Sequence, residues 1–68
     1  MNPIHKALMD RATLVLLPYN DTRELPADVE REIEEINKTL SADGRRLKIT
    51  YVNDGMQRGR IVQLELTR

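Results

Sequence analysis

The sequence contains no cysteine, which excludes disulfide bonds and thiolate-bound zinc as sources of stability. Aromatic side chains are scarce, because Tyr19 and Tyr51 are the only two. A stacking platform for RNA or single-stranded DNA depends on aromatic rings, so the composition argues against that class of binder. The hydrophobic core must therefore come from five Ile, nine Leu and four Val residues.

Long apolar runs are absent as well. The longest, "LVLL" at residues 14–17, is far too short to cross a bilayer. The first 12 residues lack the apolar core and the cleavage site that are typical of a signal peptide. We therefore expect a cytoplasmic protein with no membrane partner.

The length of 68 residues predicts a single domain, residues 1–68. A chain this short buries only about 60% of the surface that its unfolded form exposes. Sharing a core with a second copy is a common remedy, so we expect a homodimer or an obligate partner.

Charge is unevenly distributed, although the formal net charge is zero. Residues 1–20 carry two basic side chains and one acidic, residues 21–43 three basic and eight acidic, and residues 44–68 six basic and two acidic. Zero net charge argues against indiscriminate coating of DNA. The separation of charge nevertheless permits steering toward a charged partner.

Residues 25–44 have the pattern of an amphipathic acidic helix. Apolar side chains recur at spacings of four, three and four, at Val29, Ile33, Ile36 and Leu40. Pro26 fits the first helical position, and Gly44 follows the last periodic residue as a left-handed cap. Further along, residues 47–53 and 60–66 alternate apolar and polar side chains and contain β-branched residues, which predicts a β-hairpin with one face on the core.

The turn of this hairpin admits two registers. Asp54-Gly55 is a two-residue turn signal, but a turn there would place Arg58 and Arg60 on the core face. Burying an unpaired arginine costs more than a turn preference contributes. We therefore expect a six-residue tip, residues 54–59, and the cross-strand pairs Leu47–Leu66, Ile49–Leu64 and Tyr51–Val62.

The amino-terminal third begins as a helix, because Asn2 and Pro3 are a typical cap and first position. The run at 13–17 favours a short buried strand that Pro18 ends, although the helix could instead continue through Val15. Residues 18–25 are expected to be a loop. The predicted fold is a small α-β-α-β-β domain of the α+β class, in which a three-stranded sheet with a C-terminal β-hairpin packs on the acidic helix.

The residues that catalysis or metal binding would use are few, and we predict no enzyme, metal site or cofactor. His5 is the only histidine, and its helical neighbours offer no carboxylate to orient its ring. Ser41 is the only serine and has no base near it in the sequence. Glu30 and Glu34 share a helix face, but hard cations want six or more oxygen ligands, so these glutamates are expected to be a solvated face.

Two charged sets are the candidate partner-binding residues. The basic set is on the hairpin and consists of Arg45, Arg46, Lys48, Arg58 and Arg60. The acidic set is on the helix and consists of Glu30, Glu34 and Glu35. Arginine recognises carboxylate or phosphate through its planar fork, and a two-stranded ribbon can enter the DNA major groove.

The sequence thus predicts a small non-enzymatic protein-binding regulator, adaptor or inhibitor, of the kind carried by phages and mobile elements. Its acidic helix and basic hairpin would supply charge complementarity, and exposed apolar residues such as Met56 would supply affinity. The alternative is a nucleic-acid-binding protein that uses the hairpin arginines, whose binding would weaken steeply with salt.

Overall fold

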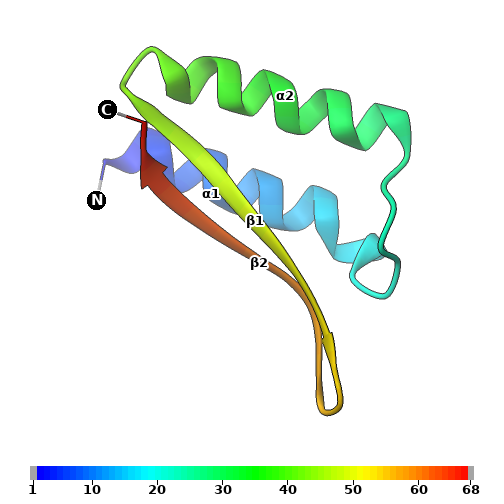
Figure 1. The fold of residues 1–68 in the computed structure, drawn as a ribbon. Coiled ribbons are helices and arrows are strands. Elements are labelled where there is room, and N and C mark those ends of the chain that lie inside the picture. The colour runs from blue at the N-terminus through cyan, green and yellow to red at the C-terminus, as the bar shows by residue number, and fades with distance from the viewer. Residues whose placement is uncertain (1, 68) are drawn as a thin grey trace.

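The computed structural model describes residues 2–67 and contains two α-helices and one β-hairpin. In chain order these are α1 (Pro3–Leu16), the 3₁₀ helix η1 (Leu17–Tyr19), α2 (Ala27–Ser41), β1 (Arg45–Asp54) and β2 (Gln57–Leu66). The helices form one layer and the hairpin the other, and the hairpin tip extends beyond the helical layer (Figure 1). The predicted α+β class is confirmed.

Helix α1 starts as the sequence indicates, since the Asn2 side chain accepts a hydrogen bond from the Ile4 amide at 2.8 Å and Pro3 follows the cap. It continues to Leu16, so the predicted strand at 13–17 is wrong and the continued helix is correct. Ala12 and Leu16, four residues apart, are both buried on one helical face. The helix also satisfies its own backbone groups, which a strand could do only beside another strand. The sheet within residues 2–67 consequently has two strands rather than three.

Helix α2 matches its prediction closely. Val29, Ile36 and Leu40 are buried. Pro26 is the N-cap and Ala27 the first helical residue, so the helix begins one residue later than predicted. Gly44 has φ 70°, the left-handed conformation expected after the helix end.

The core lies between the two layers. Ala12 of α1, Ile36 and Leu40 of α2 and Leu47 of β1 form its centre. Half-buried apolar side chains from all four elements surround that centre: Leu8, Met9, Ile33, Ile49, Val62 and Leu64. No helix within residues 2–67 combines the length and the apolar content that crossing a bilayer would need.

The hairpin register differs from the predicted one. Leu47 lies opposite Leu64 and Tyr51 opposite Arg60, a shift of two residues relative to the expected pairs. The closing pair is Asp54–Gln57, so the loop has two residues, Gly55 and Met56, instead of six. Gly55 has φ 55° and Met56 has a negative φ, as in a type II′ turn with glycine first. A two-residue shift preserves the side-chain faces, so Leu47, Ile49, Val62 and Leu64 pack in the core as predicted. Leu66, expected opposite Leu47, is instead 64% exposed.

Candidate functional site

Arg60 joins the hairpin to the segment between the helices. Its guanidinium lies over the Tyr51 ring, 5.0 Å from the ring centre. It also donates hydrogen bonds to the backbone carbonyls of Tyr19, Thr22 and Arg23, the last at 2.8 Å. Five donors in a planar fork suit such a cluster of carbonyl oxygens, whereas a lysine ammonium would not span it in the same way.

This contact explains why the register prediction failed. That prediction assumed that an arginine on the core face would be unpaired and therefore costly. Arg60 is on that face and only half-buried, and three carbonyls and an aromatic ring satisfy it. No sequence pattern signals these partners, because the carbonyls belong to a loop 37 to 41 residues earlier in the chain.

The five predicted basic residues therefore have different roles. Arg60 is held by the loop, and Arg46 forms an ion pair of 2.8 Å with Glu65, directly across the hairpin. Arg45 is half-buried. Lys48 and Arg58 are exposed and form no ion pair within residues 2–67. The set is thus not one continuous basic patch. Arg58, near the hairpin tip, is exposed and available to a partner.

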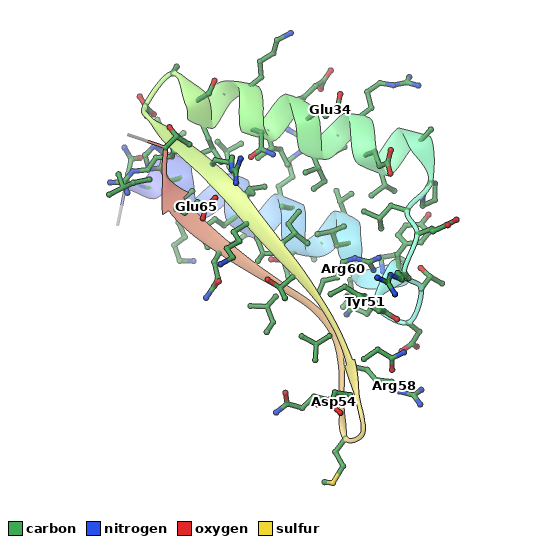
Figure 2. The ribbon with its side chains drawn as sticks, viewed as in Figure 1. Glu34, Tyr51, Asp54, Arg58, Arg60 and Glu65 are labelled. Atoms are coloured by element: carbon green, nitrogen blue, oxygen red, sulfur yellow. The ribbon has the colours of Figure 1, made fainter. Side chains whose placement is uncertain are left out.

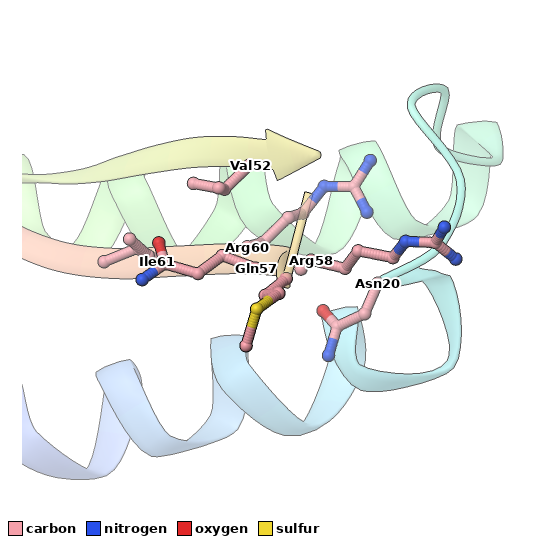
Figure 3. A pocket seen from close by; sticks show the side chains of 8 residues that line it. Asn20, Val52, Gln57, Arg58, Arg60 and Ile61 are labelled. Carbon is pink, nitrogen blue, oxygen red and sulfur yellow. The ribbon is translucent and has the colours of Figure 1, made fainter. Parts of the chain in front are cut away.

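A hollow of about 340 Å³ lies at the distal end of the hairpin, around Gly59 (Figure 3). Apolar side chains contribute Val52, Met56 and Ile61 to its lining, and polar ones contribute Asn20, Gln57, Arg58 and Arg60. Met56, at the turn, is fully exposed. We call this hollow, lined by the seven side chains above and by Gly59, the tip hollow. Apart from Met56 and the two arginines, its residues were missed in the sequence, since only the observed register and the position of the 17–23 segment bring them together.

Gly59 is the point where the tip hollow meets the loop from α1. Its φ of 127° belongs to a region that side-chain-bearing residues rarely adopt. A Cβ atom built there would lie 3.5 Å from Cγ of Asn20, so the loop and strand approach closely at this position. Gly59 and Arg60 together hold this part of β2 against the loop, and the turn of the hairpin lies beyond it.

The predicted acidic set lies elsewhere. Glu30, Glu34 and Glu35 are all exposed on α2. Figure 2 shows Glu34 on the helix and Arg58 near the hairpin tip, at separate parts of the molecule. The structure therefore does not bring the acidic and basic sets into one site. Glu32 behaves differently from its neighbours, because it pairs with Arg11 and joins α2 to α1.

His5 has a partner that the sequence did not reveal. Its Nε2 lies 2.8 Å from Oδ2 of Asp43, which is in the turn between α2 and β1. His5 is only 7% exposed, and the whole of β1 separates Asp43 from the hairpin tip. The pair therefore connects the start of α1 to the α2–β1 turn. Strand β1 separates it from the tip hollow by a strand length of about 30 Å.

Within residues 2–67 there is no group of three or more His, Asp or Glu side chains that could hold a metal ion. Comparison with known proteins gives no relative: no protein-family model, no curated protein and no solved structure matches this chain.

Proposed function

We propose that this protein is a small non-enzymatic protein-binding module that contacts its partner with the distal end of the hairpin. A regulator, adaptor or inhibitor acting in the cytoplasm, of the kind carried by phages and mobile elements, fits this description. The observation that carries the proposal is the tip hollow, an apolar and arginine-bearing surface on a hairpin that extends beyond the helical layer (Figure 1).

The chemistry of the tip hollow suits a protein surface. Methionine and arginine are both enriched at protein interfaces, and Met56 and Arg58 are both exposed. Methionine adapts its shape to a partner, and a free guanidinium can pair with a carboxylate. The partner surface would therefore combine an apolar side chain with an acidic one.

The hydrogen bonds of Arg60 to the loop support the same proposal, because they limit the conformational entropy that the hairpin would lose on binding. A mobile hairpin would lose conformational freedom when a partner binds, and that loss weakens affinity. Because Arg60 and Gly59 already hold β2 against the 17–23 segment close to the tip, less freedom remains to be lost.

Fewer basic side chains of the hairpin are available to bind nucleic acid than the sequence indicates. Arg46 is paired with Glu65, and the fork of Arg60 is occupied by carbonyl oxygens. Lys48, Arg58 and the half-buried Arg45 then remain as phosphate contacts on the hairpin. Three contacts spread along the hairpin would give weak binding, since affinity for nucleic acid grows with the number of phosphates neutralised.

The test compares three immobilised proteins in extracts of the cells that produce this chain. The wild type should retain a specific protein, and the double variant Met56→Glu with Arg58→Glu should lose it. Glu34→Lys is the control, because it also changes charge on an exposed residue but lies on α2. Retention of the same protein by the tip variant would refute the proposed contact.

Nucleic acid is tested separately by light scattering coupled to size-exclusion chromatography, with a short DNA duplex at low and moderate salt. The proposal expects the protein to elute without DNA at both salt concentrations. Co-elution at low salt that disappears as salt rises would instead make Arg58 and Lys48 phosphate contacts.

A further inference from the structure

Strand β2 presents an unpaired backbone edge. In an antiparallel pair, alternate residues direct their N–H and C=O groups away from the neighbouring strand. The Leu47 amide donates to the Asn37 side chain at 2.8 Å rather than to β2, so Leu47 is one of the outward-facing residues of β1. Its partner in the register, Leu64, is then outward-facing on β2, as are Val62 and Arg60.

The two edges of the sheet are not equivalent. On β1, the side chain of Asn37 from α2 already occupies the outward amide of Leu47. On β2, the backbone groups of Arg60, Val62 and Leu64 make no hydrogen bond outside the hairpin within the part of the chain described. An edge of this length without proline or a covering element is a template for another strand.

The surface area indicates how much a partner would cover. Folded monomers follow a trend that gives about 4,400 Å² of accessible surface for a chain of this mass, 7.9 kDa. The protein exposes 5185 Å², roughly 800 Å² more than that trend. Its radius of gyration, 12.2 Å, likewise exceeds the value of about 11 Å for a compact chain of this length. Each partner in a standard interface contributes about 800 Å², so the excess matches one such interface.

We propose that β2 pairs antiparallel with β2 of a second copy, which makes a four-stranded sheet with a two-fold axis at Ile61. Ile61 is the large apolar side chain in the middle of the solvent face of β2, and it is 50% exposed. With the axis there, Ile61 faces Ile61 of the second copy, and the outward groups of Arg60 bond to those of Val62 across the interface. No like charges are opposed in this register, because Arg58 faces Leu64 and Gln57 faces Glu65 of the second copy.

The absence of cysteine makes a disulfide test clean. Residues at a non-hydrogen-bonded antiparallel pair have Cα atoms about 4.5 Å apart, within the range of about 4.4–6.8 Å that a disulfide requires. Ile61→Cys should therefore form a covalent dimer under mild oxidation. Thr50→Cys is the matched control, since Thr50 lies opposite Ile61 on the same face but on β1. Across the dimer, two Thr50 residues would be three strand spacings apart, about 14 Å, and should not link.

A second variant tests the edge itself. Val62→Pro removes an outward amide that makes no hydrogen bond among the described residues, and proline is tolerated on edge strands. Light scattering should report a dimer for the wild type and a monomer for Val62→Pro, with circular dichroism showing that the variant is folded.

Each result decides the matter. A monomeric wild type, equal cross-linking of both cysteine variants, or a dimer that persists in folded Val62→Pro would overturn the proposal. If Val62→Pro fails to fold, the contrast between Ile61→Cys and Thr50→Cys decides it alone. These measurements need no external partner, so they succeed or fail independently of the contact proposed for Met56 and Arg58.

Discussion

At the scale of single residues, Arg60 has the most consequences. Its side chain connects β2 to carbonyls of the loop after α1, as many as 41 residues away in sequence. A contact between distant segments holds the tertiary arrangement rather than any one element. It also removes this guanidinium from the set available to a ligand.

Arg60→Lys should lower the free energy of unfolding by about 1–3 kcal/mol, because a point charge cannot replace the planar fork and leaves carbonyl acceptors without their donor. Urea denaturation followed by circular dichroism measures this change. Arg58→Lys is the control and should stay within about 0.5 kcal/mol, since Arg58 is exposed and makes no hydrogen bond within residues 2–67. Equal effects of the two substitutions would show that the loop contacts do not stabilise the fold.

Two glycines of the hairpin should respond differently to alanine. Gly59 has φ 127°, a conformation that residues with side chains rarely adopt. Gly59→Ala should therefore lower the free energy of unfolding by about 1–3 kcal/mol. Gly55 also has a positive φ, 55°, but a Cβ atom there would meet only open space, so Gly55→Ala should cost less, about 1 kcal/mol. Thermal or urea unfolding of both variants gives the comparison. A smaller loss at Gly59 than at Gly55 would contradict the strained geometry described for β2.

At the scale of elements, α1 is fixed at several points along its length. His5 contacts Asp43 near its start, Arg11 pairs with Glu32 of α2 at its middle, and Leu16 is buried at its end. These contacts reach both α2 and the α2–β1 turn. They explain why the run at 13–17 continues the helix instead of joining the sheet.

Substitutions at Leu14 and Leu16 distinguish the helix from the strand. In a strand the two residues would share a face and respond alike. In α1, Leu16 is 1% exposed and Leu14 is 69% exposed. Leu16→Ala should therefore cost about 2–5 kcal/mol, and Leu14→Ala about 0.5 kcal/mol or less. Chemical denaturation of both variants is the measurement, and similar losses would argue against the helix at this position.

At the scale of the whole molecule, stability is limited by size. A domain of 68 residues has a free energy of unfolding of roughly 3–10 kcal/mol, so Leu16→Ala alone would remove a large share of it. Among residues 2–67 the fully buried large side chains are few: Leu16, Ile36 and Leu40. An added interface along β2 would raise this total by burying Ile61.

The proposed dimerisation along β2 would make thermal stability depend on protein concentration. The unfolding midpoint of the wild type should rise by a few degrees for each tenfold increase in protein, because association stabilises the folded state by mass action. The midpoint of Val62→Pro should not change with concentration. Differential scanning calorimetry over two decades of concentration makes the comparison, and a constant midpoint for the wild type would count against the dimer.

The sequence alone determined the elements whose patterns are local. The four apolar residues of α2 and the left-handed Gly44 follow from helical spacing and cap chemistry. The core face of the hairpin follows from alternation with period two, which is unchanged when the register shifts by two residues. Met56 and Arg58 are exposed as predicted, but Arg58 lies in β2 and not in the predicted six-residue tip.

Only the tertiary structure decided the rest, because the partners lie far apart in the chain. The register depended on whether Arg60 could be satisfied, and its carbonyl acceptors come from the 19–23 segment. The state of residues 13–17 depended on what Leu16 could pack against, and the role of His5 depended on Asp43, 38 residues away. Local spacing fixes which face of an element is apolar, whereas pairing across such distances is set by how the elements pack.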